Sequence, residues 1–288
     1  MLLVQLPFML WNARANQKMT GSKNVMERLN VFLLTDVEGI AGVDSIDEMD
    51  RESERYLETR KKLCHSINLA VDACFESGAT ALYYLDGHGG GGNVIEGEID
   101  PRAVKCTIAQ WQELLKNGSI DCQIELGSHA RAGTVGGFLD HTLSSKLIYF
   151  IKLNGVEMSE VSLHATLCAR YGVPIVAVTG DEVACAQAKE YLPDVFVGAV
   201  KRATRRNIAT TYPNADEILQ STVKAALAGR HSVSCARYTT PLVVEQAYYR
   251  TDMCEETLDH CTSDFERVDA RTLRKTVSAI SSYADLKF

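Results

Sequence analysis

The sequence lacks an excess of positive charge. Its 288 residues include 30 Lys and Arg against 37 Asp and Glu, so the net charge is −7 at pH 7. A broad basic surface, which binding to nucleic acid or to anionic lipid requires, is therefore not expected. After the first ten residues, no apolar run approaches the roughly 20 residues of a membrane-spanning helix. These two absences argue against a nucleic-acid-binding protein and against a membrane protein.

The nine cysteines lack the pairing of a disulfide-stabilised protein. Their number is odd and no two of them form a C-x-x-C pair. Most lie within apolar or helical patterns, where a free cysteine behaves as a small hydrophobic side chain. A secreted, disulfide-bonded domain would be shorter, with more evenly paired cysteines. We therefore expect free thiols and a reducing compartment, the cytoplasm.

Several catalytic and phosphate-binding motifs are also missing. The sequence has no G-x-x-x-x-G-K-[ST] loop and no G-x-S-x-G turn, and no cysteine is flanked as a nucleophile would be. The glycine run after His88 does not fit G-x-G-x-x-G with an acidic partner at the usual offset. These absences argue against a nucleotide-binding regulator and against a serine or cysteine hydrolase. No internal repeat or low-complexity segment is present.

Residues 1–29 are treated as an N-terminal extension outside the fold. The segment 1–10 is apolar, but its basic residues Arg14, Lys18 and Lys23 follow the apolar run. A secretory signal carries its positive charge first, so this order argues against one. Two other interpretations fit the segment about as well as a secretory signal does: a weak transit peptide, or a true translation start at Met19 or Met26.

Strand-length apolar runs alternate with helix-length periodic segments from residue 31 onward. This alternation predicts an α/β fold, with a mostly parallel sheet flanked by helices. We expect this main domain to span residues 30–205. The expected strands are 31–35, 81–85, 123–126, 146–153, 174–178 and 195–200, and the expected helices are 52–77, 104–116, 159–170 and 182–192.

The last part of the chain breaks the alternation. We expect a helix at 215–228, a strand at 241–248 and a helix at 270–284. This pattern predicts a smaller C-terminal α+β domain over residues 206–288.

Polar side chains follow the first three strands of the expected sheet. Asp36 and Glu38 come after the first strand, His88 after the second and His129 after the third. The carboxyl ends of parallel strands share one edge, where ligands bind. Alone, an Asp there is often a turn or cap residue and a His is often a loop residue. Together, carboxylates and imidazoles without thiolates favour a site for zinc, or less selectively for manganese or iron.

These residues also carry a family resemblance. Over about residues 31–206, the sequence resembles the zinc-dependent D-aminopeptidase family. The residues that carry the resemblance are Asp36-x-Glu38-Gly39, Asp86-x-His88, Gly127-x-His129-Ala130-Arg131-Ala132, a later His141, and Asn154 followed by Glu160. The similarity includes the Gly180-Asp181 and Ala199-Val200-Lys201 stretches.

The resemblance implies two zinc ions in each chain. Asp36 would bridge the two ions. Glu38 and His88 would hold one ion, and His129 and Glu160 would hold the other. The expected main domain would thus carry the metal site.

The resemblance also assigns roles around the metals. It makes His141 the catalytic residue, as general acid/base or as nucleophile. Arg131 and Asn154 would orient the substrate, although each is equally suited to anchoring its loop through backbone hydrogen bonds. Glu157 competes with Glu160, because both lie near the start of one helix and three residues apart. We prefer Glu160, whose six-residue offset from Asn154 matches that of the family.

The implied activity is removal of an N-terminal residue, a small D-amino acid such as D-alanine, from short peptides. The resemblance also implies a ring-like homo-oligomer, with a decamer as the size it suggests. A related metallohydrolase of another amide and a non-catalytic metal-binding oligomer are the alternatives. A non-catalytic protein would not need an acid/base histidine beside the metal ligands, so the presence of His141 favours an enzyme.

Four other residues are interpreted as structural. His65 and His164 lie within expected helices and are predicted to be surface or packing residues. Lys201 and Arg206 follow the last expected parallel strand. They are predicted to be solvated, with contact to a neighbouring subunit as the alternative.

Overall fold

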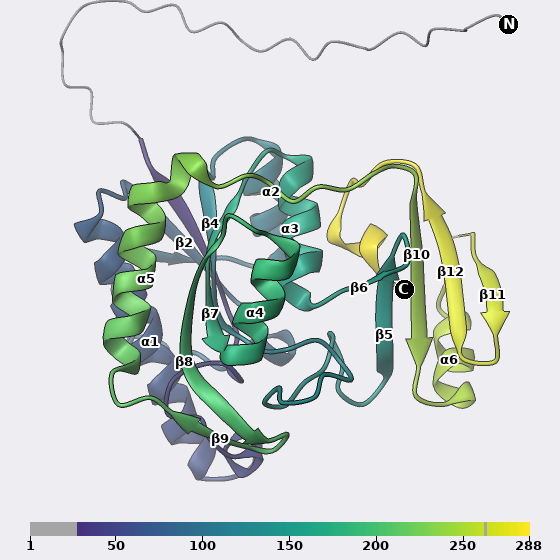
Figure 1. The fold of residues 1–288 in the computed structure, drawn as a ribbon, viewed down its shortest axis with the longest axis horizontal. Helices are drawn as coiled ribbons and strands as arrows, with labels where there is room; N and C mark the ends of the chain where they lie inside the picture. The colour runs from purple at the N-terminus through teal and green to yellow at the C-terminus, as the bar shows by residue number, and fades with distance from the viewer. Residues whose placement is uncertain (1–27, 262–263) are drawn as a thin grey trace, which may run out of the picture.

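A seven-stranded sheet forms the centre of the main body (Figure 1). The computed structural model describes residues 28–261 and 264–288. Neighbouring strands are parallel, except that β9 runs antiparallel to β8. In sheet order the strands are β3 (Ala103–Lys105), β2 (Ala81–Asp86), β1 (Asn30–Thr35), β4 (Cys122–Ser128), β7 (Ile175–Asp181), β8 (Phe196–Arg205) and β9 (Ile208–Thr211).

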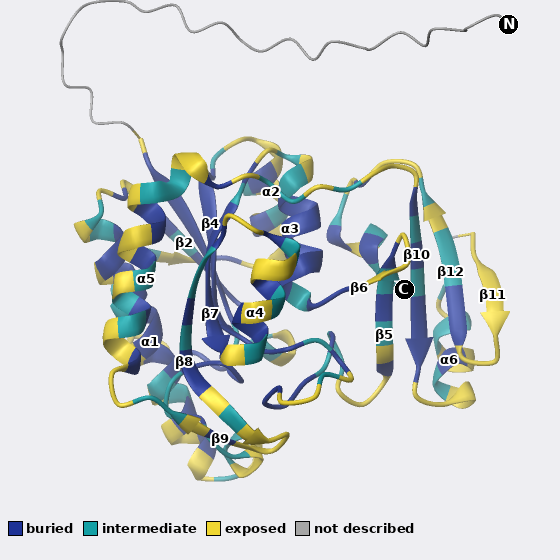
Figure 2. Cartoon of the chain, in the orientation of Figure 1, coloured by how far each residue is buried: buried dark blue, intermediate teal, exposed yellow. Residues whose placement is uncertain are grey.

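Helices cover both faces of this sheet, so every residue of β1, β4 and β7 is buried (Figure 2). On one face, α1 (Arg55–Glu76) and α5 (Ala215–Gly229) pack against side chains such as Val31 and Leu33. On the other face, α2 (Ile108–Lys116) and α3 (Glu160–Arg170) pack against Phe32 and Leu34, and α4 (Glu182–Tyr191) packs against β7. Burial on both faces explains the continuous apolar runs of the central strands.

A second, antiparallel sheet lies beside the first, on the far side of α2 and α3 (Figure 1). Ile151 and Val244 of this sheet share a core with Leu163 and Leu167 of α3. In sheet order its strands are β11 (Glu266–Asp269), β12 (Thr272–Val277), β10 (Leu242–Tyr248), β5 (Ile148–Leu153) and β6 (Val156–Glu157). The remaining elements are α6 (Thr251–Leu258) and the short 3₁₀ turns η1 (Ile46–Met49), η2 (His88–Gly90), η3 (Arg230–Ser232) and η4 (Tyr283–Leu286).

The predicted fold class is confirmed, but two elements differ from the prediction. The helix expected at 270–284 is wrong, because β12 and η4 occupy that segment. The strand expected at 146–153 forms as β5, yet it belongs to the antiparallel sheet. Its burial alternates, unlike that of the strands in the parallel sheet centre.

The division of the chain at residue 206 stays a prediction. Strands β5 and β6 precede that residue but belong to the second sheet. Strand β9 follows it but belongs to the first sheet, and α5 packs against the first sheet. Each sheet therefore contains strands from both sides of the expected boundary.

Most of the expected N-terminal extension, residues 1–27, lies outside the described residues. Leu29 is buried in the core, and its carbonyl accepts a hydrogen bond from Thr80 N. All nine cysteines are free thiols, as expected, and seven are buried. Within the described part of the chain, no helix combines the length and apolar character that crossing a membrane requires.

Candidate metal centre

The carboxyl ends of β1, β2 and β4 lie at one edge of the sheet. Thr35 of β1 is level with Asp86 of β2 and Leu126 of β4. The residues that follow these strands therefore leave the sheet side by side. This register brings together the loops that carry Asp36, His88 and His129.

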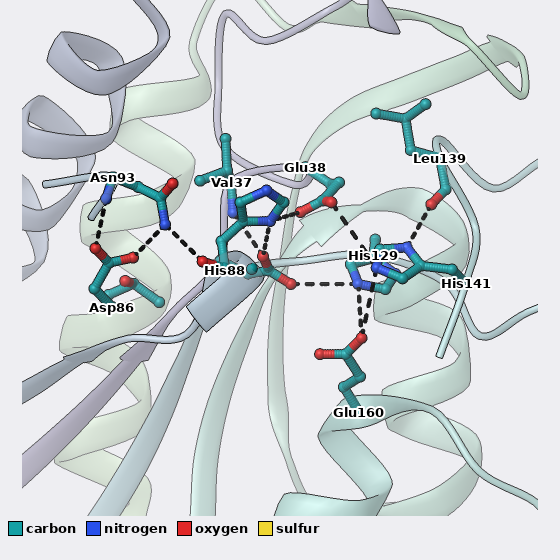
Figure 3. Close-up of polar contacts among 12 residues, drawn as sticks. Val37, Glu38, Asp86, His88, Asn93, His129, Leu139, His141 and Glu160 are labelled. Atoms are coloured by element: carbon teal, nitrogen blue, oxygen red, sulfur yellow. Dashed lines mark hydrogen bonds and ion pairs between the residues drawn. The ribbon is translucent and has the colours of Figure 1, made fainter. Parts of the chain in front are cut away.

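Asp36 lies between two groups of potential ligands. Figure 3 shows these groups, Glu38 with His88 and Glu160 with His129. Its Oδ1 is 3.1 Å from His88 Nδ1, and its Oδ2 is 3.3 Å from His129 Nε2. Glu38 Oε2 is 2.9 Å from the same His88 nitrogen. Glu160 Oε1, at the start of α3, is 3.3 Å from His129 Nε2. The two oxygens of one carboxylate thus face two different histidines.

Two atoms of this cluster are buried and make no hydrogen bond of normal geometry, although each lies close to another side chain of the cluster. They are Glu38 Oε2 and His129 Nε2. Buried polar atoms in folded proteins almost always have a partner, so each such atom needs an explanation. Carboxylate and imidazole donors that converge without thiolates are a ligand set for zinc. The residues therefore fit bound divalent metal ions.

His141 is the third imidazole at the site. Its ring stacks on that of His129, with centroids 4.0 Å apart and planes 6° apart. His141 Nδ1 is 2.9 Å from the carbonyl oxygen of Leu139. A carbonyl only accepts, so this bond places a proton on Nδ1 and leaves the Nε2 lone pair of a neutral ring free. Nε2 is 3.7 Å from Glu160 Oε1 and 4.0 Å from Glu38 Oε1.

The cluster attracts positive charge. Burial alone would raise the pKa of Asp36, but the facing imidazoles of His129 and His88 lower it well below its usual range. Burial alone would also raise the pKa of Glu160, yet His129 lowers it to about 2. For His88, burial would lower the pKa, and Glu38 and Asp36 raise it to about 11. A site with this electrostatic character holds cations, whether protons or metal ions.

The loop of His88 is fixed by residues farther from the cluster. Asn93 donates to Asp86 through its backbone N (2.8 Å) and its Nδ2 (2.7 Å), and Nδ2 also donates to His88 O at 2.7 Å. The guanidinium of Arg51 donates to His88 O and to Asn93 Oδ1. The sequence indicated Asp86 but gave no sign of Asn93 or Arg51.

The loop of Asp36 and Glu38 lies directly on the end of β4. A Cβ atom at Gly39 would be 2.1 Å from Ser128 O. At Gly127, where φ is +79°, a Cβ atom would be 2.3 Å from Asp36 O. Both positions require glycine, because any side chain would separate the two backbones.

Three further predicted residues lie outside the cluster. Glu157 is exposed and pairs with Arg131 at 3.5 Å, so Glu160 is the glutamate that the fold brings to the histidines. The side chain of Asn154 donates to Thr239 O and accepts from Val243 N, which ties the β5–β6 hairpin to the segment before β10 and to the start of β10. These bonds match the anchoring role that was the alternative for Asn154.

The prediction that Lys201 is solvated is wrong. Lys201 has 0% exposure, and its ammonium group donates to the carbonyl oxygens of Glu38 and Val43. Burial lowers the pKa of Lys201 to about 8. The residue stands at the end of an apolar run within β8, and this position was the only sign of burial in the sequence.

The side chain of Arg206 is half-exposed and contacts the loop of His141. Its Nε is 2.9 Å from Asp140 Oδ1, and its backbone oxygen accepts from Leu139 N. The two helical histidines lie where expected, with His65 exposed beside Asp216 and His164 buried.

Comparisons with known proteins identify a matching family and a similar fold. The sequence model of the D-aminopeptidase family matches residues 29–286. A D-aminopeptidase from Bacillus subtilis (strain 168) is 27% identical over 182 residues, which cover 62% of this chain and 66%, just under two thirds, of that protein. The solved structure of the Zn-dependent D-aminopeptidase DppA from Bacillus subtilis, a self-compartmentalizing protease, superposes with a TM-score of 0.81. That match has 20% sequence identity and covers 90% of this chain and 95% of the other, which shows a shared fold.

Proposed function

The chain belongs to the D-aminopeptidase family, and from this premise we propose that it is a zinc metallo-aminopeptidase of short peptides. The observation that carries the proposal is the pair of donor groups on either side of Asp36. The similar proteins named above are D-aminopeptidases, one of them zinc-dependent. We therefore propose a small D-residue, such as D-alanine, as the one that is removed.

We assign two zinc ions to the cluster. Asp36, Glu38 and His88 would hold one ion, and Asp36, His129 and Glu160 would hold the other. Each ion then has three protein ligands, and a catalytic zinc site keeps the remaining position open. When bound, such ions act as Lewis acids toward a carbonyl group and lower the pKa of water.

We assign His141 to catalysis. Its Nε2 lies close enough to be considered a ligand with His129 and Glu160. With Asp36 counted, however, the second ion already has three ligands without His141. The bond to Leu139 O holds the ring with Nε2 toward the cluster, where Nε2 accepts a proton and returns it. A nucleophilic role would use the same atom.

Substrate binding follows from the charges around the cluster. The free α-amine of a peptide, which is cationic at neutral pH, pairs with the carboxylates at the site and restricts cleavage to the N-terminus. Arg131, two residues after His129, is proposed to orient the rest of the peptide. Asn154 is assigned to the β5–β6 hairpin instead, because its amide is already bonded to Thr239 and Val243.

We also propose a homo-oligomer in the cytoplasm. The structurally similar protease is described as self-compartmentalizing, which requires several copies of one chain around an enclosed space. The nine free thiols favour a reducing compartment.

The test combines metal analysis with hydrolysis of D-Ala-D-Ala and L-Ala-L-Ala by wild type and His141→Ala. We expect close to two zinc ions per chain and turnover of the D-peptide. The variant should lose turnover by about 100-fold or more and keep its zinc, since general acid/base catalysis contributes about 10²–10⁴-fold.

Other results would separate the alternatives. Zinc binding with turnover of neither peptide would indicate another amide substrate or a non-catalytic protein. If the purified protein neither contains zinc nor takes it up, the ligand assignment is wrong. Loss of zinc in His141→Ala would make His141 a ligand.

A further inference from the structure

Lys201 is a buried cation without an ion-pair partner among the described residues. It lies on β8 with 0% exposure. Its Nζ donates to Glu38 O at 2.7 Å and to Val43 O. The ring centroid of Phe138 is 4.8 Å away. The ammonium group is therefore held by two backbone carbonyls and one aromatic face.

Burial of this ammonium group costs desolvation free energy, which its contacts with the loop must offset. A buried charge is normally paired with an opposite charge, because desolvation of an ion is unfavourable. Asp44, Asp181, Glu38 and Glu48 provide a favourable field at Lys201. Both hydrogen bonds nevertheless go to the main chain of one loop, residues 38–43. The bonds therefore fix the path of that loop.

The loop that Lys201 fixes is the one that carries Glu38. Lys201 contacts the carbonyl of Glu38, and the carboxylate of Glu38 points to the metal cluster, where its buried Oε2 is 2.9 Å from His88 Nδ1 (Figure 3). Gly39 N donates to Gly127 O at 2.8 Å. The main chain at Glu38 and Gly39 is thus held from β8 on one side and from β4 on the other.

We propose that Lys201 is a positioning residue for Glu38, which holds the loop 38–43 so that the Glu38 carboxylate meets His88 at the first metal position. The proposal rests on the metal centre of the proposed function. Lys201 does not touch a metal ion or a substrate. It acts through the backbone of a ligand, and loss of such outer contacts typically weakens metal affinity by about 10–100-fold.

The experiment titrates metal-free full-length protein with cobalt(II), read by visible absorption, and with zinc. Lys201→Met removes the charge and donors at nearly constant side-chain length. Lys201→Gln keeps an N–H donor without the charge. Arg202→Met is the matched control, because Arg202 is the next residue of β8 and is exposed. Thermal unfolding of every variant monitors the fold.

We expect Lys201→Met to fold and to bind one of its two cobalt ions about 10–100-fold more weakly, with an altered absorption spectrum for that ion. The second ion, assigned to His129 and Glu160, should keep its affinity. Lys201→Gln should fall between Lys201→Met and wild type, and Arg202→Met should match wild type.

Two outcomes overturn the proposal. One is wild-type affinity and spectrum at both positions in Lys201→Met. The other is failure of both Lys201 variants to fold, which would show that Lys201 serves the sheet as a whole. If wild type itself binds no metal, the proposed function fails, and this result is distinct from a change confined to the Lys201 variants.

Discussion

At the scale of single residues, Asp36 differs from the other candidate ligands because it contacts both halves of the cluster. Its two carboxylate oxygens face different histidines, whereas Glu38 faces His88 and Glu160 faces His129. A change at Asp36 should therefore affect both metal positions, while a change at either glutamate should affect one.

Asp36→Asn is expected to reduce bound zinc from about two ions to fewer than one per chain. The amide keeps the size of the side chain but loses the negative charge that the two proposed cations would share. Metal analysis after dialysis against a fixed low concentration of free zinc measures the effect. Glu38→Gln is the matched variant and should keep about one ion. Equal zinc content in the two variants would contradict a bridging role for Asp36.

Three of the candidate ligands could be brought together from the sequence because they lie close to strand ends. Asp36 directly follows an apolar run, His88 and His129 each lie three residues after one, and the parallel sheet brings these ends together. The supporting residues could not be found in this way. Lys201 reaches Glu38 from a strand that lies 163 residues later in the chain. Long-range contacts to a backbone carbonyl leave no pattern in a single sequence.

At the scale of elements, the β8–β9 hairpin supports the loops of the site. Lys201 near its start holds the loop of Glu38, and Arg206 at its turn holds the loop of His141. Ala209 N donates to Asp44 O, and Ile46 N donates to Asn207 O, so the hairpin also secures the segment after the first loop. The edge strand β9 is thus covered by the backbone of the segment that follows the loop of Glu38.

Arg206→Ala is expected to lower kcat and leave zinc content unchanged. Without its bonds to Asp140, the loop that carries His141 loses one anchor, and a displacement of about 1 Å at a catalytic group can cost up to about 100-fold in rate. Steady-state kinetics with the D-peptide measure kcat and KM separately. Arg205→Ala, at the exposed neighbouring position, is the control. A change in KM alone, or equal effects of the two substitutions, would contradict the proposed positioning of His141.

Element types were predictable where burial produces a clear pattern. The helix expected at 52–77 agrees with α1, because its apolar face repeats with helical period. The expected helix at 270–284 is wrong because Thr272–Val277 pairs with β10, whose sequence lies about 30 residues earlier. Tertiary pairing determined that segment, and no local pattern indicates it.

At the scale of the whole molecule, a buried polar group connects the parallel sheet with α2, α3 and the C-terminal turn η4. Glu125 of β4 is 3.2 Å from His164 Nδ1 of α3. The ring of His164 lies 5.6 Å from that of Trp111 in α2 and 5.3 Å from that of Tyr283 in η4. Side chains from the parallel sheet, two helices and the C-terminal turn therefore meet at one imidazole.

This group makes stability depend on pH. Burial alone would lower the pKa of His164, but the Glu125 carboxylate outweighs burial and raises it. A folded-state pKa above the unfolded value of 6.5 stabilises the protein fully below about pH 6.5, and the stabilisation is lost as pH rises through the folded-state pKa. We expect the free energy of unfolding of wild type, relative to His164→Asn, to decrease from pH 6 to pH 9. Denaturant unfolding at several pH values measures this difference, and a constant or increasing difference would contradict the prediction.

The placement of β5 also bears on how the protein is made. β5 is complete at residue 153, but its long partner β10 begins at residue 242. A chain emerging from the ribosome therefore carries β5 with one edge unpaired while nearly 90 further residues are synthesised, and unpaired strand edges promote association between chains. Glu160 follows β5 and β6 directly. We therefore expect Glu160 to reach its final position beside His129 only after the C-terminal strands have been synthesised and have paired with β5. Zinc would then bind after translation.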